Sequence, residues 1–297
     1  MRIPSFFPAW LASIGRIIGL LTLVATLTSC SAIKLAYNNF DQVAYWWLDS
    51  YLDLTNDQSP RVRQDLARLQ QWHRTQELPQ FLGMLRKLEQ MAPGEITAAQ
   101  ACAFVPPVRE RLKVLAERAE PAAVTLAISL EPEQVVHLER KYQRTIAEYR
   151  KDWVRLPRPE LREKQMKKFL ERSEMIYGSL DEPQRQVLRA QMEQSIFDPG
   201  RVLAERQRRQ QDALQTLRKL VGQPVSLSDA RGLMGGLLKR VQESPDAEFR
   251  RYQQTLIDEG CRTFAALHNS TSAAQREAAV RRLRGYQREL NELVAQQ

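Results

Sequence analysis

Two carboxylates stand one helical turn apart at Asp49 and Asp53, next to Trp46 and Trp47. Paired carboxylates on one helix face are residue types that can act as general acid and base. No second group of catalytic residues accompanies the pair, so we expect both acids to be solvated or ion-paired on an amphipathic helix. The tryptophans of that helix would either pack or lie at the level of lipid headgroups, where amphipathic rings are favoured.

The three histidines, His73, His137 and His268, are far apart in sequence, and none has a metal-binding spacing. No Cys/His cluster with zinc spacing, no GxSxG motif, no phosphate-binding glycine loop and no dinucleotide motif is present. We therefore expect no metal ion, no cofactor and no enzymatic activity. A hydrolase of an envelope polymer, with its site assembled from distant residues, is the alternative.

Arginines gather on a predicted helix that Asp198-Pro199 opens, at positions Arg201, Arg206, Arg208 and Arg209. Guanidinium groups bind phosphate and carboxylate groups through paired N–H donors, so these four residues are a candidate anion-binding site. Lipopolysaccharide and peptidoglycan are the ligands that this hypothesis names. The alternative is a solvated helix face with intrahelical ion pairs to Glu205.

Residues 1–29 have the order of a secretory signal. They contain two arginines and no acid, and an apolar run from Ile17 to Thr26 precedes the tetrad Leu27-Thr28-Ser29-Cys30. The uncharged run that starts at Ile17 ends before Lys34 after seventeen residues, whereas a membrane-spanning helix needs about 20. An uncleaved inner-membrane anchor is therefore the alternative to cleavage.

The tetrad that ends at Cys30 resembles a bacterial lipobox. That resemblance implies that residues 1–29 are removed and that the Cys30 thiol carries a diacylglyceryl group. Residue 31 is serine rather than aspartate, which by the sorting pattern of such lipoproteins implies an outer-membrane location facing the periplasm. Acyl chains on the amino-terminus would hold the chain on the membrane without a spanning helix.

The chain is basic, with a formal charge of +9 that falls to +7 when the two arginines of residues 1–29 are removed. A positive balance suits contact with anionic partners at the cell envelope. Because the predicted signal exports the chain, we do not expect nucleic acid to be its partner.

Two cysteines, Cys102 and Cys261, remain after Cys30. An even number in an oxidising compartment predicts a disulfide, which would stabilise the fold by roughly 4 to 5 kcal/mol through the loop that it closes. Two buried free thiols are the alternative.

Nearly every segment has apolar residues at helical spacing, and no alternating β pattern appears, so the fold class is all-α. The last helix shows the pattern well, with Val280, Leu283, Tyr286 and Leu290 on one side. Pro79 should kink or break the helix in which it lies. No linker divides the chain, so residues 30–297 are expected to form one domain, with a subdivision near 198–200 left open.

Helix starts are marked by a recurring pattern of a capping residue with glutamine three positions later. In this capping box the glutamine side chain accepts from the backbone N–H of the capping residue. The copies are Thr55–Gln58, Thr97–Gln100, Glu131–Gln134, Asp181–Gln184 and Ser272–Gln275. The first two also resemble the LTxxQ motif of the Spy and CpxP family, which implies a periplasmic protein that holds unfolded clients or senses envelope stress.

A second resemblance extends over most of the chain, to an uncharacterised proteobacterial family of lipoproteins. It rests on Ala32–Asn39, Trp46–Asp49, Tyr51–Thr55, Trp72–Arg74, Glu77–Pro79, Glu205–Gln211, Cys261 and His268–Thr271. This resemblance implies an outer-membrane lipoprotein and supplies no activity, substrate or catalytic residue.

Together these observations predict an outer-membrane-anchored, periplasm-facing, all-α lipoprotein that acts by binding or as a scaffold. Its expected partners are the membrane, through Cys30, and envelope proteins, unfolded clients, lipopolysaccharide or peptidoglycan. An LTxxQ-type chaperone or stress protein is the first alternative, and the hydrolase is the second.

Overall fold

The structure, a computed structural model, describes residues 33–222 and 224–296. Within these ranges the chain forms helices and no strand, as the apolar spacing predicts. The helices are α2 (Phe40–Leu52), α3 (Ser59–Trp72), η1 (His73–Glu77), α4 (Leu78–Met91), α5 (Ala98–Cys102), α6 (Val105–Ser129), α7 (Pro132–Tyr149), η2 (Arg150–Val154), α8 (Arg158–Tyr177), α9 (Glu182–Glu193), α10 (Pro199–Leu220), α11 (Leu227–Gln242), α12 (Ala247–Ser270) and α13 (Ala273–Ala295).

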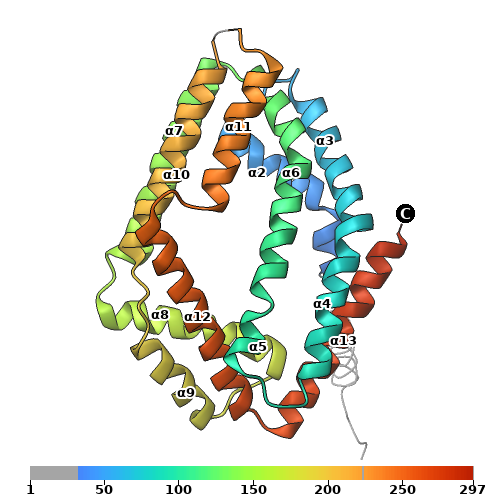
Figure 1. Ribbon diagram of the computed structural model, residues 1–297, viewed down its shortest axis with the longest axis vertical. Helices are drawn as coiled ribbons and strands as arrows, with labels where there is room; N and C mark the ends of the chain where they lie inside the picture. The colour runs from blue at the N-terminus through green and yellow to red at the C-terminus, as the bar shows by residue number, and fades with distance from the viewer. Residues whose placement is uncertain (1–32, 223, 297) are drawn as a thin grey trace, which may run out of the picture.

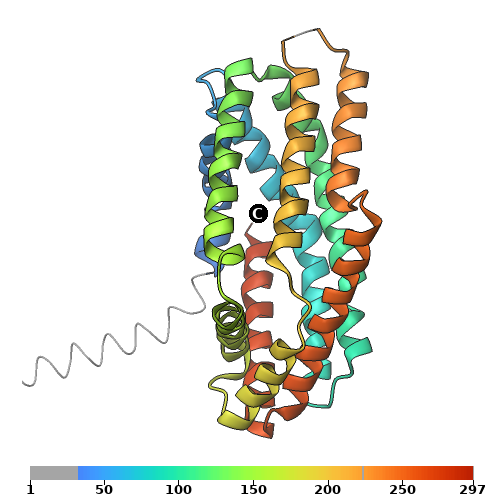
Figure 2. The same ribbon diagram turned by 90° about the vertical axis from the view of Figure 1, so that its left-hand side faces the viewer.

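The helices form an elongated body with a hydrophobic cluster toward each end (Figure 1). At the upper end α6, α7, α10 and α11 share a core that includes Val124, Leu138, Leu214 and Met234. Figure 2 shows α7, α10 and α11 standing side by side there. At the lower end α8, α9, α12 and α13 meet around Tyr177, Leu180, Leu188, Leu267 and Ala279.

The chain visits both ends more than once. It passes from α7 at the upper end to α8 and α9, returns upward through α10, and descends again through α11 and α12 (Figure 1). Each hydrophobic cluster therefore combines segments that are separate in sequence. A single cut near 198–200 would divide both clusters.

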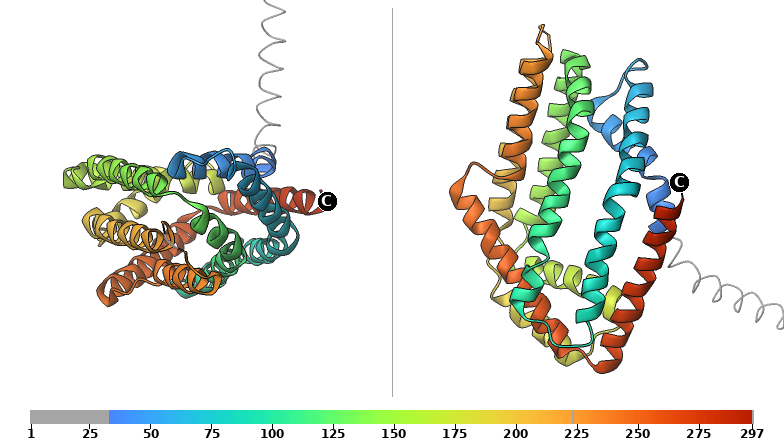
Figure 3. Two further views of the ribbon diagram at one scale, coloured as in Figure 1. Left: turned by 90° about the horizontal axis from the view of Figure 1, so that it is seen from above. Right: turned by 45° about the vertical axis from the view of Figure 1, so that its right-hand side comes forward.

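Pro79 does not end the helical run in which it lies. The chain continues from α3 through the π-helical segment η1 into α4, along one side of the body (Figure 3, right). The N–H of Leu78 donates to His73 O, five residues back instead of four. Because proline has no N–H and clashes with the carbonyl four residues before it, the wider turn accommodates Pro79 without a break. The regular α-helix is therefore interrupted just before Pro79, in line with the prediction, although the helical run continues.

The capping boxes form as the sequence predicts. Helices α5, α7, α9 and α13 begin directly after Thr97, Glu131, Asp181 and Ser272, and each glutamine Oε1 accepts from the N–H of its capping residue. In the box Thr55–Gln58, the Thr55 N–H likewise donates to Gln58 Oε1. This bond closes the turn just before α3, which begins at Ser59.

The glutamines of four boxes also pair with one another across the fold. Gln58 and Gln134 exchange two amide hydrogen bonds, with Nε2 to Oε1 distances of 3.0 and 2.9 Å. Gln184 and Gln275 do the same at 2.6 and 2.9 Å. In Figure 1 the helices of the first pair, α3 and α7, begin at the upper end, whereas α9 and α13 begin at the lower end. Each end of the body thus has one reciprocal glutamine pair.

Each paired glutamine also donates to the carbonyl end of a neighbouring helix. Gln58 Nε2 donates to Ser129 O at the end of α6, and Gln134 Nε2 donates to Leu52 O at the end of α2. Gln184 Nε2 donates to Ser270 O at the end of α12, and Gln275 Nε2 donates to Ser179 O after α8. One pair therefore satisfies backbone groups at two helix starts and two helix ends.

A disulfide joins α5 to α12. The Sγ atoms of Cys102 and Cys261 are 2.06 Å apart, and 159 positions separate the two residues in sequence. In the chain-entropy account a loop of this length disfavours the unfolded state by about 5 kcal/mol. The bond attaches the short helix α5, which has little buried surface of its own, to the longer α12.

The glutamine pairs predict a stability difference between two otherwise similar boxes. Gln134→Leu removes bonds to Gln58, Leu52 O and Glu131 N–H at a buried position and should lower the free energy of unfolding by about 2 to 3 kcal/mol. The control Gln100→Leu, in the exposed box of α5, should cost no more than about 1 kcal/mol. Urea unfolding measures both, and equal losses would contradict the special role of the pair.

Candidate functional site

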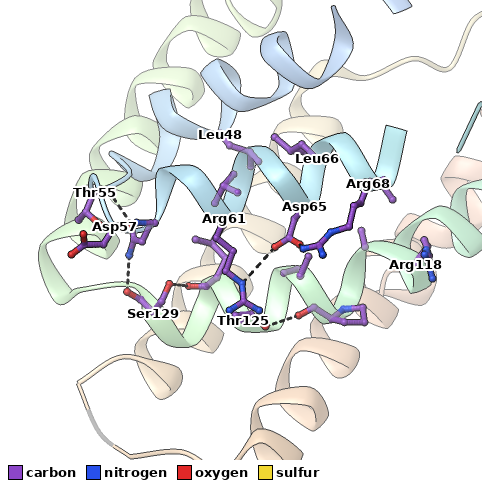
Figure 4. Close-up of a pocket in the computed structure, with 18 of the residues that line it drawn as sticks. Leu48, Thr55, Asp57, Arg61, Asp65, Leu66, Arg68, Arg118, Thr125 and Ser129 are labelled. Atoms are coloured by element: carbon purple, nitrogen blue, oxygen red, sulfur yellow. Dashed lines mark hydrogen bonds and ion pairs between the residues drawn. The ribbon is translucent and has the colours of Figure 1, made fainter. Parts of the chain in front are cut away.

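A groove of about 700 Å³ lies between α3 and α6, with the end of the α2–α3 turn at one side. Its apolar lining comes mainly from Leu48, Val62, Leu66, Leu69, Ala122 and Leu126. Its charged lining comes from Asp57, Arg61, Asp65, Arg68, Arg118 and Glu131. Figure 4 shows these side chains reaching the groove from both helices. We name this feature the α3–α6 groove.

The sequence of the two helices explains why the groove is open. The apolar positions of α3 recur at spacings of three and four, so they form one stripe that faces α6. The facing part of α6 carries the small residues Ala119, Pro121, Ala122 and Ala123, which leave space that larger side chains would fill. The hydroxyls of Thr125 and Ser129 donate within α6, to Pro121 O and Leu126 O. The groove therefore combines an apolar surface with hydroxyls that are already paired.

The charges of the groove balance one another. Asp65 accepts from Arg68 at 2.7 Å and lies 3.8 Å from Arg61, on the same helix. The guanidinium of Arg118 lies 5.8 Å from the centre of the Trp72 ring. Trp72 lines a smaller cavity that shares Arg68 and Arg118 with the groove. Three arginines and three carboxylates line the groove, so it has no single sign of charge.

The glutamine pair closes one end of this groove. Gln58 lines it, and the Ser129 carbonyl that accepts from Gln58 Nε2 belongs to another lining residue. The position of α3 against α6 is thus set by a hydrogen bond from one helix start to one helix end.

A second groove, of about 530 Å³, is almost entirely apolar. It lies between α4, the α5–α6 region and α12, and the disulfide residue Cys261 is part of its lining. Its aromatic and aliphatic side chains include Phe81, Leu85, Leu88, Phe104, Val108 and Phe264. We name it the α4–α12 groove.

The four arginines of the predicted anion site divide into two groups. Arg208 donates to both carboxylate oxygens of the buried Glu205, at 2.8 and 2.9 Å, and Arg209 donates to the same carboxylate at 2.7 Å. This is the arrangement of intrahelical pairs that the sequence left as the alternative. Arg201 and Arg206 instead lie over the rings of Tyr252 and Tyr149, at 5.3 and 5.2 Å.

Glu205 is the centre of a network that joins three elements. Burial alone would raise the pKa of Glu205, but hydrogen bonds from Arg208, Arg209 and Ser244 outweigh it and hold that pKa below its ordinary value. Asp212 accepts two bonds from Arg240 of α11, and hydrogen bonds from Arg240 lower the pKa of Asp212. The network connects α10 to α11 and to the connection before α12, so Arg208 and Arg209 bind an internal carboxylate and not an external anion.

The carboxylates Asp49 and Asp53 end α2 and do not act on a common point. Asp49 Oδ1 accepts from Leu54 N–H at 3.0 Å, and Asp53 has the left-handed conformation of a helix C-terminus with φ of 49°. The Asp53 carboxylate lies 3.9 Å from His137 Nδ1. The neighbouring Trp46 and Trp47 are exposed, so they do not pack into the body.

His268 is fully buried and fixes the α4–α5 connection to α12. Its Nε2 donates to Gly94 O at 2.8 Å, so its Nδ1 accepts from the Tyr177 hydroxyl at 2.8 Å. Burial lowers the pKa of His268, the bond to Gly94 raises it and Arg276 lowers it, with a net decrease. Burial also raises the pKa of Tyr177 to about 12. The neighbouring Asn269 exchanges two hydrogen bonds with the backbone of Ile96.

His73 has a similar environment near the other end of the chain. Its Nδ1 lies 2.9 Å from the Tyr37 hydroxyl, and burial lowers its pKa, an effect that Glu77 partly offsets. His73, His137 and His268 are held by different elements and do not meet. Over residues 33–222 and 224–296, no three side chains of His, Cys, Asp or Glu are grouped so that they could hold a metal ion.

The predicted lipidation residue Cys30 and the cleavage position before it lie outside the described residues. In the part of the chain that the structure does describe, none of the helices combines the length and the apolar character needed to cross a bilayer.

The sequence did not single out either groove. The residues that shape the α3–α6 groove from α6, such as Arg118 and Thr125, belong to no motif, and the only signal is the run of small residues around Pro121. Grooves between helices depend on how far apart the helices stand, and helical spacing within one segment carries no information about that distance.

Fold and groove together define the class: an all-helical protein with elongated grooves and several buried polar networks. A model of a family of unknown function, DUF6279, matches residues 50–227, more than half of the chain. The chain belongs to the DUF6279 family. No curated protein and no solved structure matches it.

The buried neutral histidine predicts that the protein loses stability in mild acid. The pKa of His268 is lowered in the folded state, whereas the unfolded chain titrates near the ordinary value of about 6.5. Below that value the unfolded state binds more protons, so the free energy of unfolding should fall as the pH decreases from 7 to 5. His268→Gln should reduce this dependence, to which the lowered pKa of His73 also contributes, and the control His137→Gln should preserve it, as measured by urea unfolding at each pH. The same slope in both variants would contradict the role of His268.

Proposed function

We propose that the protein is an outer-membrane-anchored, periplasm-facing lipoprotein, without catalytic activity, that binds polypeptide segments of other envelope proteins in the α3–α6 groove. The observation that carries the binding role is the composition of this groove, which offers an apolar surface flanked by arginines and carboxylates in equal number. The anchor is supported by the tetrad that ends at Cys30 and by Ser31 after it. A proteobacterial origin, which the sequence resemblance implies, belongs to the same proposal.

A polypeptide suits the α3–α6 groove better than a polyanion does. A phosphorylated polymer would meet the carboxylates of Asp57, Asp65 and Glu131 together with the arginines. A peptide offers apolar side chains for Leu66 and Leu69 and charges of both signs for the rim. A volume of about 700 Å³ is in the range of sites that enclose a small ligand or a few residues of a peptide.

Holding unfolded clients is a second candidate function, and the α4–α12 groove favours it. That groove is apolar, and two of its side chains, Val108 and Phe264, are exposed. Exposed apolar surface of this kind can bind the apolar segments of an unfolded chain. The first LTxxQ-like box supports this candidate less, because Gln58 is buried at a helix start and bonded to Gln134.

The anchor is tested by Cys30→Ala in cells that produce the full chain. The native chain should incorporate a labelled fatty acid and fractionate with the outer membrane, whereas the variant should lose the label completely. Ser31→Asp is the matched control, and it should keep the label while it moves the protein toward the inner membrane. A native chain that takes up no label would contradict lipidation at Cys30.

The binding site is tested by photo-crosslinking in intact cells, with a photoreactive residue placed at one position at a time. Positions Arg68 and Thr125 probe the α3–α6 groove, Met84 and Val108 probe the α4–α12 groove, and the exposed Val136 on α7 is the control. We expect discrete protein adducts from Arg68 and Thr125 at several times the yield from Val136. Adducts only from Met84 and Val108, of many sizes, would favour client holding, and equal yields at all positions would exclude a defined binding groove.

A further inference from the structure

The fully exposed positions of the segment that precedes and forms α2 are all uncharged, and its charged residues Lys34, Asp41 and Asp49 are half-buried. Among residues 33–52, the exposed positions are Leu35, Ala36, Asn38, Asn39, Phe40, Gln42, Val43, Trp46, Trp47 and Ser50. In a chain in which 27% of residues are charged, an exposed helix face of this length would ordinarily carry several charges. The face is therefore unusual for a helix that meets only water.

Large apolar side chains dominate this face. The exposed fractions are 68% for Leu35, 48% for Phe40, 56% for Val43, 62% for Trp46 and 59% for Trp47. At 100° per residue, the four that belong to α2 project within one sector of about 120°, and Leu35 lies in the helical segment just before it. A contiguous exposed apolar surface marks a site of interaction with a membrane or a protein.

The opposite side of α2 is used by the fold. Tyr45 is buried and donates to Ser59 Oγ at 2.9 Å, and Leu48 lines the α3–α6 groove. Helix α2 packs against α3 and α7 and lies on the outer side of the body in the view from above (Figure 3, left). The apolar face therefore looks outward and no described element covers it.

Cations lie near the borders of this face. Arg63 donates to Gln42 at one border, and Lys141 lies over the Tyr51 ring at 5.1 Å at the other. Arg74 lies 5.5 Å from the centre of the ring of Tyr37, in the segment before α2. Positive side chains around an uncharged aromatic face complement the anionic headgroups of a bilayer.

We propose that the outward face of α2, with Leu35 before it, is a membrane-docking surface that lies in the headgroup region of the bilayer. The proposal rests on the proposed function in one respect, since acyl chains at Cys30 would hold the chain at that bilayer. Ten positions separate Cys30 from Phe40, and a stretch of that length reaches at most about 35 Å, so the anchor and the face can meet the same membrane surface. Tryptophan rings at the level of the headgroups are the arrangement that the interface favours.

Docking of this face gives the body a fixed orientation. Because Leu48 projects from the other side of α2 into the α3–α6 groove, the groove would open away from the bilayer, toward the periplasmic space. A lipid anchor alone would leave the body free to rotate on its tether. The two contacts together make the groove available to soluble segments of envelope proteins.

The test uses full-length protein, purified from membranes and bound to vesicles of phosphatidylethanolamine and phosphatidylglycerol in a 3:1 ratio. Trp10, Trp72 and Trp153 are replaced by Phe, so that all tryptophan fluorescence comes from Trp46 and Trp47. Bromine atoms on the upper acyl carbons of the lipids should quench about half of this emission, and the vesicles should reduce quenching by aqueous acrylamide severalfold. A matched chain that retains only Trp153 should show neither effect.

Flotation with the vesicles separates the two proposals. A chain that floats but whose Trp46 and Trp47 stay quenched by acrylamide, and not by bromolipid, would overturn docking and leave the anchor intact. A Cys30→Ser chain that floats as well as the native protein, with bromolipid quenching, would support docking and overturn the need for the anchor. A native chain that does not float would overturn both.

Discussion

The reciprocal glutamine pairs are the interaction on which the arrangement of the helices depends. Each pair combines two capping boxes into one contact, so that a single set of amide groups serves two helix starts and the carbonyl ends of two neighbouring helices. Buried backbone groups at helix ends must find partners, and at these two places the partners come from a distant part of the chain. The spacing of α3, α6 and α7 follows from this contact, and so does the shape of the α3–α6 groove.

Other polar contacts hold the elements that the glutamine pairs do not reach. The Glu205 network fixes α10 against α11 and the start of α12, His268 and Asn269 hold the α4–α5 connection, and the disulfide attaches α5. The two hydrophobic clusters lie toward opposite ends of the body. Polar networks of this kind require each partner to be in place, because a buried group left alone costs free energy. They therefore specify the arrangement of long helices that share limited apolar contact.

Much of the fold could be predicted from local sequence. The helix starts at Thr97, Glu131, Asp181 and Ser272 follow from capping boxes, because the box is complete within four residues. The pairing of the glutamines could not be predicted, since nothing in a box indicates which other box it meets. The interruption of the α-helix at Pro79 could also be predicted, but the π-helical turn that carries the helical run past it could not, because helix propensity does not include such turns.

The site was less predictable than the fold. The arginine run suggested an external anion, but the position of Glu205 one turn away allowed Arg208 and Arg209 to be satisfied internally. The sequence left open whether Trp46 and Trp47 pack into the body. Helix α2 packs against α3 and α7 through its other side, so both tryptophan side chains are exposed. The grooves depend on distances between helices, which the sequence of one helix does not contain.

Coupling energies between glutamines test the central claim most directly. Two double-mutant cycles with alanine make this test. The cycle at Gln58 and Gln134 measures the contact within one pair. The cycle at Gln134 and Gln275 is the control, because these two glutamines belong to different pairs at opposite ends of the body. The account predicts non-additivity of about 1 kcal/mol or more within the pair, and additivity within about 0.5 kcal/mol across the two pairs. Additive effects of Gln58→Ala and Gln134→Ala would contradict it, because the two glutamines would then act as independent caps.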